Sequence, residues 1–197
     1  MKLFLALVLV SLTCAACAGD SATPAADAKP APAPCPAVSG FLTAQLRGGL
    51  THDISWKGVE LQCEGGPRPE GKGLRLTFAG PLPSAPVPDA TPADAPPRQL
   101  RFIFGVDLND AAAGAVRVLP TNITVILEGA QQIFATRGDD RCAIESLERM
   151  PVAGNAKLEQ VHARGYCISP AIDLASEATL LVPTFEFTGV VATGEDP

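Results

Sequence analysis

The sequence has few of the residues and motifs that usually reveal an enzyme. It contains two histidines, one tryptophan and one tyrosine, and aromatic residues make up only 5% of the chain. The spaced motifs of serine hydrolases, zinc peptidases and phosphate-binding loops are all missing. Without these signals no catalytic residues stand out, and we expect no enzyme activity, no cofactor and no metal site.

Positive charge and long apolar runs are also scarce. The chain has 15 basic and 21 acidic side chains, which gives a formal charge of −6. Nucleic acids and anionic lipids attract basic patches, so we expect no nucleic-acid partner. Residues 3–12 form an apolar run, but a membrane-spanning helix needs about 20 apolar residues.

This short apolar run follows Lys2 at the N-terminus. A basic residue before a short apolar segment is typical of a secretory signal, which is removed after export. The alternative is a buried core helix. We favour the signal, because the run is terminal and a proline-rich stretch comes after it.

The stretch Ala15-Ala16-Cys17 resembles the bacterial lipoprotein box, although Cys14 stands where that family prefers leucine. The resemblance implies cleavage before Cys17 and a diacylglyceryl group on its sulfur. Small residues at Ala16 and Ala18 leave a second possibility, namely ordinary signal cleavage before Gly19. The first would anchor the protein in a membrane, and the second would release a soluble secreted protein.

These features divide the chain into three parts. Residues 1–16 are predicted to be the signal, and residues 17–38 an Ala/Pro-rich tether. Such a composition buries too little apolar surface to fold and behaves as an extended spacer. Residues 39–194 are predicted to form one folded domain, interrupted by a proline-rich exposed loop at 81–97.

Four cysteines lie outside the signal region: Cys35, Cys63, Cys142 and Cys167. An even number in an exported chain predicts two disulfides, for which three connectivities exist. We expect Cys35–Cys63 and Cys142–Cys167, because both pairs are neighbours in sequence and close loops of similar size. No pair has the close spacing of zinc ligands, so a metal site is disfavoured.

The folded part is dominated by a period of two. Apolar residues alternate with polar ones over 74–78, 100–106, 123–127 and 184–188. Alternation of this kind places one side of a strand on a core and the other in water. We therefore predict an all-β fold, a single antiparallel sandwich or open barrel. The phase changes at Lys57-Gly58, which predicts either a β-bulge or two strands joined by a turn.

Helical patterns are rare. Residues 143–150, AIESLERM, are predicted to form two helical turns that end at Pro151. A further turn is expected around 109–113. The tripeptide Arg137-Gly138-Asp139 matches a motif that some adhesion receptors read, but Gly-Asp is also what a tight turn requires, and we favour the turn.

The layout of the C-terminal third, RGDDRCAI followed by RGYCISP and a Phe-rich last strand, resembles that of assorted bacterial envelope lipoproteins of sandwich type. With the signal and tether, it leads us to expect a lipid-anchored protein of the bacterial cell envelope that faces the periplasm or the exterior. We expect a non-enzymatic binding or structural module with an envelope protein or glycan as partner. The alternatives are a soluble secreted β protein, and a periplasmic hydrolase that uses His52 and Asp53; His162 is expected to be solvated.

Overall fold

The structure is a computed structural model that describes residues 35, 40–70, 73–83, 98–108 and 118–192. They all fall within one of two units of the chain, Pro32–Pro197. The strands are β1 (Phe41–Gly48), β2 (His52–Lys57), β3 (Gln62–Pro67), β4 (Gly73–Pro81), β5 (Gln99–Asp107), β6 (Leu119–Leu127), β7 (Gln132–Ala135), β8 (Cys142–Val152), β9 (Asn155–Cys167), β10 (Ala171–Asp173), β11 (Thr179–Leu181) and β12 (Phe185–Ala192).

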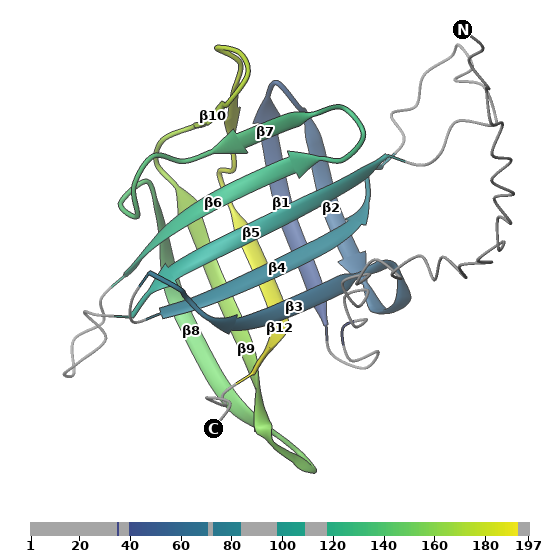
Figure 1. The fold of residues 1–197 in the computed structure, drawn as a ribbon, viewed down its shortest axis with the longest axis vertical. Helices are drawn as coiled ribbons and strands as arrows, with labels where there is room; N and C mark the ends of the chain where they lie inside the picture. Colours follow the sequence, from purple (N-terminus) through teal and green to yellow (C-terminus); the bar gives the residue numbers. More distant parts are fainter. Residues whose placement is uncertain (1–34, 36–39, 71–72, 84–97, 109–117, 193–197) are drawn as a thin grey trace, which may run out of the picture. The chain divides into compact units, whose positions relative to one another are not determined.

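All of these strands pair antiparallel, and they form two layers. One layer has the order β3-β4-β5-β6-β7, and the other has the order β2-β1-β12-β9-β8. Figure 1 shows the first layer crossing in front of the second. The layers are joined where β6 pairs with β8 and where β10 and β11 connect β7 to β1. The predicted all-β antiparallel fold is confirmed.

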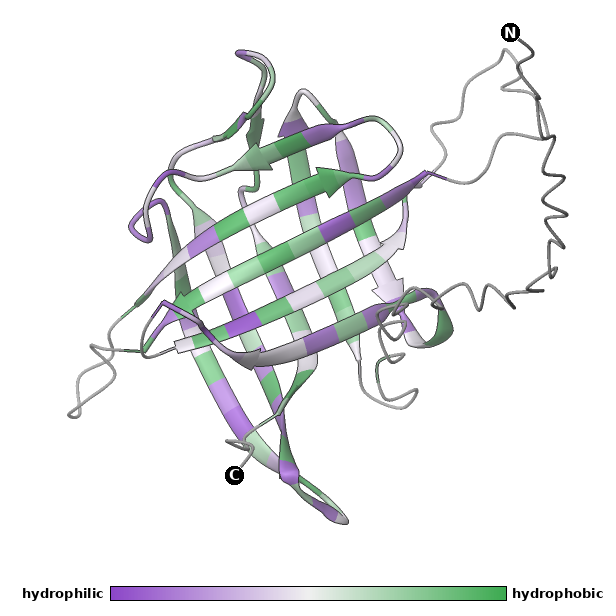
Figure 2. Ribbon diagram, viewed as in Figure 1, coloured by the Kyte–Doolittle hydropathy of each residue, from purple (hydrophilic) through white to green (hydrophobic). Residues whose placement is uncertain are grey.

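The core lies between the two layers and is built by the predicted alternation. In β4, β5, β6 and β12 the inward residues are almost completely buried, among them five phenylalanines: Phe78, Phe102, Phe104, Phe185 and Phe187. Figure 2 shows the same alternation as bands of colour along β4, β5 and β6. Phe104 of one layer lies 4.7 Å, centroid to centroid, from Phe187 of the other. Aromatic contacts therefore bridge the layers at the centre.

Thr188 departs from the predicted alternation. It lies on the outer side of β12, yet only 4% of its surface is exposed. Its cross-strand neighbours are Phe41 and His162, whose ring centroids lie 5.9 Å apart. A small side chain between two rings on one face loses contact with water, because directly opposite residues lie close together.

The phase change at Lys57-Gly58 is a turn between two strands, so the β-bulge is the wrong alternative. A short 3₁₀ turn, Gly58–Glu60, separates β2 from β3. Gly58 has a φ of 58°, in the left-handed region that glycine enters without steric cost. The turn carries the chain from one layer to the other, which explains why the inward residues change parity.

Trp56 of β2 ties the two layers together near this turn. Its indole packs on Gly80 of β4, where an added Cβ would come within 2.5 Å of the ring. The indole N–H also donates a 2.9 Å hydrogen bond to the carbonyl oxygen of Pro81. Only glycine at position 80 leaves room for the Trp56 indole. Trp56 is therefore only 2% exposed.

The helix predicted at 143–150 does not exist, because these residues belong to β8. This strand pairs with β9 along nearly its whole length and with β6 at its start. Glu, Leu, Arg and Met favour helices intrinsically, but two isolated turns are only marginally stable. Pairing with two neighbouring strands outweighs that preference.

Both predicted disulfides are present. Cys142 and Cys167 are cross-strand neighbours on β8 and β9, with Cα atoms 3.9 Å apart. Cys35 is bonded to Cys63 of β3, with Cα atoms 5.0 Å apart. The pairing expected from sequence spacing alone is confirmed.

Several predictions concern residues beyond those that the structure describes: the signal at 1–16, nearly all of the tether, most of the proline-rich loop, and the helical turn at 109–113. In the part of the chain that is described, no helix has the length and apolar character needed to cross a membrane.

Candidate functional site

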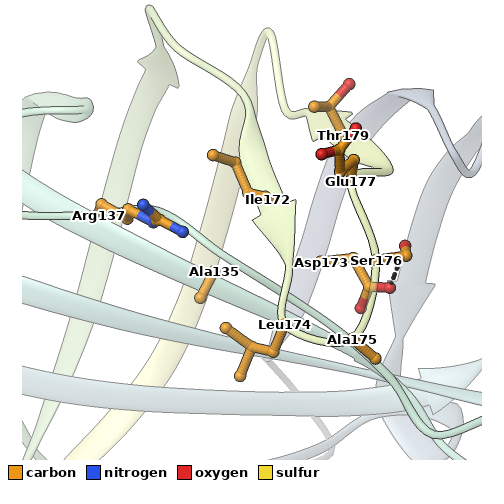
Figure 3. Close-up of a pocket in the computed structure, with 9 residues that line it drawn as sticks. All are labelled: Ala135, Arg137, Ile172, Asp173, Leu174, Ala175, Ser176, Glu177 and Thr179. Atoms are coloured by element: carbon orange, nitrogen blue, oxygen red, sulfur yellow. Dashed lines mark hydrogen bonds between the residues drawn. The ribbon is translucent and has the colours of Figure 1, made fainter.

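A cavity of about 570 Å³ lies on the outer side of β7, β10 and β11, and it opens to solvent. This volume is in the range of small-ligand sites. Figure 3 shows the side chains that line it, which are Ala135, Arg137, Ile172, Asp173, Leu174, Ala175, Ser176, Glu177 and Thr179. We treat it as the candidate site because apolar groups meet a few polar and charged ones there.

Strand register places the centre of this cavity. Ile172 of β10 pairs with Ala135 of β7 and with Thr179 of β11. The three residues therefore form one row on the outer face. Strands β10 and β11 have only three residues each, so few side chains stand on this part of the face. The recess follows from the shortness of the strands.

The loop between β10 and β11 is held in shape by Asp173. Its carboxylate accepts a 2.6 Å hydrogen bond from the Ser176 hydroxyl and a 3.1 Å bond from the backbone N–H of Ile133. The Ser176 hydrogen bond, helped by backbone N–H groups, lowers the pKa of Asp173 below its ordinary value against an opposing effect of burial. Asp173 therefore fixes the loop as a carboxylate.

Besides Asp173, two charged groups border the cavity on different sides. In Figure 3, Arg137 lies on one side of Ile172 and Glu177 lies on the other. Among the described residues, neither side chain takes part in an ion pair. Leu174 is 70% exposed at the same cavity. An apolar side chain, a cation and an anion are thus all available to a ligand.

A second recess, of about 330 Å³, lies on the outer face of the other layer. Its lining is mostly polar and includes Thr43, Gln45, Asp53, Arg164 and Glu186. Several of these groups are already paired within the protein. Asp53 lies 2.8 Å from Arg47, and Glu186 lies 3.0 Å from the His162 ring nitrogen. These pairs leave fewer groups for a ligand than the cavity on β7, β10 and β11 has.

The residues of the hydrolase alternative are not brought together. His52 and Asp53 are adjacent on β2, and neighbours on a strand face opposite sides. The Asp53 carboxylate is engaged by Arg47 instead. His162 faces outward as predicted, but it is half-buried, hydrogen-bonded to Glu186 and packed against Phe41. Its surroundings are therefore more structured than those of a solvated histidine.

The Arg137-Gly138-Asp139 tripeptide is a turn, as favoured by its sequence. Gly138 has a φ of 89°. The Asp139 carboxylate accepts hydrogen bonds from Asn122 on β6 and from Arg68, the latter at 3.3 Å. These hydrogen bonds tie the turn to the sheet, so the Asp139 carboxylate is already paired within the protein. Of the tripeptide, only Arg137 reaches the cavity.

The sequence reasoning overlooked the cavity loop, residues 173–178. One local signal was present, since an aspartate followed three residues later by a serine favours a turn closed by side-chain hydrogen bonds. The position of Arg137 beside that loop had no such signal. It depends on the pairing of β7 with β10, which joins segments about 40 residues apart.

No metal-binding group of three or more suitable side chains is found among the residues that the structure describes. Comparison with known proteins gives no match to a family model, to a curated protein or to a solved structure. The cavity and its chemistry therefore rest on the geometry of this chain alone.

Proposed function

We propose that the protein is an exported lipoprotein of the bacterial cell envelope, anchored through Cys17, with a non-enzymatic binding or structural role. The observation that carries this proposal is the pair of disulfides in the β domain. Disulfides persist in oxidising compartments outside the cytosol. They support the export that the N-terminal sequence predicts.

The Cys35–Cys63 disulfide also fixes the point at which the proposed tether joins the domain. It attaches the chain to β3 18 positions after Cys17. The Ala/Pro-rich residues between Cys17 and Cys35 would act as a spacer, at about 3.1 Å per residue when extended. A domain on such a spacer stands off a membrane surface, where its outer faces remain open to an envelope protein or glycan.

Lipid labelling in the native host tests the anchor. We expect radiolabelled palmitate to be incorporated into the wild-type protein and into a Cys14→Ala variant, which serves as the matched control. The Cys17→Ala variant should lose the label and leave the membrane fraction. Absence of label from the wild type would favour the soluble secreted alternative, and loss of label in Cys14→Ala alone would move the anchor to that cysteine.

A further inference from the structure

The cavity on β7, β10 and β11 has a floor that is ready for an apolar group. Ala135 and Ile172 lie side by side in one cross-strand row, and Leu174 borders them. The Leu174 side chain is 70% exposed. A ligand that covers it lowers the free energy by roughly 25 cal/mol for each Å² of apolar surface removed from water. This part of the site therefore favours a ligand with an aliphatic group.

The loop that carries Leu174 is preorganised. The backbone N–H of Asp173 donates to the carbonyl oxygen of Ala178, and that of Leu174 donates to Ile133, both at 2.9 Å. Ser176 donates to Asp173 and accepts from the backbone N–H of Ala178 at 3.2 Å. These bonds hold the loop before any ligand arrives, so binding has little ordering entropy to overcome.

Of the three charged groups that line the cavity, Asp173 is already hydrogen-bonded to Ser176 and Ile133, which leaves Arg137 and Glu177 to select the ligand. The guanidinium of Arg137 is suited to a carboxylate, which it can bind with two parallel hydrogen bonds. Glu177, on the other side of Ile172, is suited to an ammonium group. A ligand that satisfies both must carry a negative and a positive group with an apolar part between them.

We propose that this cavity binds a short apolar peptide with free ends, its C-terminal carboxylate at Arg137 and its N-terminal ammonium at Glu177. A fatty acid matches Arg137 and the apolar floor but places its tail against the Glu177 carboxylate. A neutral glycan satisfies neither charge. The inference concerns the folded domain, and it does not depend on the proposed anchor at Cys17.

The test measures binding of the tripeptide Ala-Leu-Ala by calorimetry or NMR titration to the full protein with both disulfides formed. Amidation of the peptide's C-terminus should weaken binding to the wild type about fivefold, the size of a partly exposed charged pair. The same amidation should make no difference to an Arg137→Gln variant. Acetylation of the N-terminus should show the same relation to Glu177→Gln.

Matched controls separate the two charges from charge in general. Arg75→Gln and Glu64→Gln remove exposed charges outside the cavity lining, and both should bind and discriminate like the wild type. A Leu174→Ser variant should weaken binding of every form of the peptide equally. Circular dichroism confirms that each variant is folded, as expected for exposed positions.

Three results would overturn the proposal. One is the absence of saturable binding at millimolar tripeptide. Another is equal affinity for free and blocked peptides. The third is binding of octanoate that is as tight as that of the peptide and insensitive to Glu177→Gln, which would reassign the cavity to a fatty acid. None of these outcomes bears on palmitate labelling at Cys17, so the anchor stands or falls separately.

Discussion

The space between the two layers and the outer face of β7, β10 and β11 are built from the same kind of strand, but they are filled differently. Between the layers, long strands bring large side chains from both sides into contact, as in the pair Phe78 and Phe187 with ring centroids 5.0 Å apart. On the outer face, strands of three residues leave an open cavity beside Leu174.

This difference shows how strand length decides whether a face of the sheet is filled by side chains. A long, strictly alternating strand has enough side chains on each face to close the space above it. A short strand cannot do so, and the loop after it must be held by its own hydrogen bonds, as Asp173 and Ser176 show. Stability should therefore depend on the interior, and ligand binding on the outer face.

The largest effect is expected at the centre of the interior. Phe104→Ala removes a ring that is fully buried and contacts both Phe185 and Phe187. We expect the free energy of unfolding to fall by about 3–5 kcal/mol, measured by urea denaturation. Ile103→Ala, the outward-facing neighbour on β5, is the control and should cost clearly less. Equal losses at the two positions would contradict the contrast between interior and outer face.

Removal of the cross-strand disulfide should have the next largest effect. Replacing both Cys142 and Cys167 by Ser avoids a free thiol and opens a loop of 25 residues. We expect a loss of about 3 kcal/mol in unfolding free energy, most of it from the greater freedom of the unfolded chain. The same unfolding measurement on a Cys35→Ser/Cys63→Ser variant gives the comparison, because that variant loses the other disulfide and keeps this one. An unchanged midpoint would mean that β8 and β9 are held by pairing alone.

A smaller loss is expected at the cavity loop, and it should depend on pH. Asp173→Asn removes the carboxylate that accepts from Ser176 and Ile133. Because the folded-state pKa of Asp173 is lowered, its contribution is complete above the ordinary value of 3.8 and is lost as the pH falls through the folded-state pKa. The stability difference between wild type and variant should shrink in acid. A difference that is constant with pH would rule out this role.

The smallest effect is expected at Leu174, which is 70% exposed. Leu174→Ser should change the unfolding free energy by no more than about 0.5 kcal/mol, as is usual for surface positions. Leu76→Ser, at a fully buried position of β4, is the matched control and should destabilise strongly. A large loss at Leu174 would show that the cavity wall belongs to the core.

Local sequence patterns predicted much of the fold. Apolar residues recur at every second position over 74–78, 100–106 and 123–127, and this spacing matches the geometry of a strand. The disulfide pairs could be predicted because each cysteine pairs with its neighbour in sequence, and the two pairs close loops of similar size. The β8 strand could not, because Glu145 to Met150 favour a helix by propensity and are held extended only by β9 and β6.

The candidate site was beyond the reach of the same patterns. Its residues come from two separate stretches, Ala135 with Arg137 and residues 172–179. Each stretch taken alone is a strand end followed by a turn. Their combination depends on the register between β7 and β10, which places Ala135 opposite Ile172.

By itself the sequence determined an all-β body with two disulfides, because alternation and cysteine spacing act locally and leave few alternatives. Only the tertiary structure decided that β6 would pair with both β7 and β8, and that Arg137 and Glu177 would border one cavity. These are long-range pairings. They are selected by how well whole layers bury their apolar faces, and no short stretch of sequence contains that information.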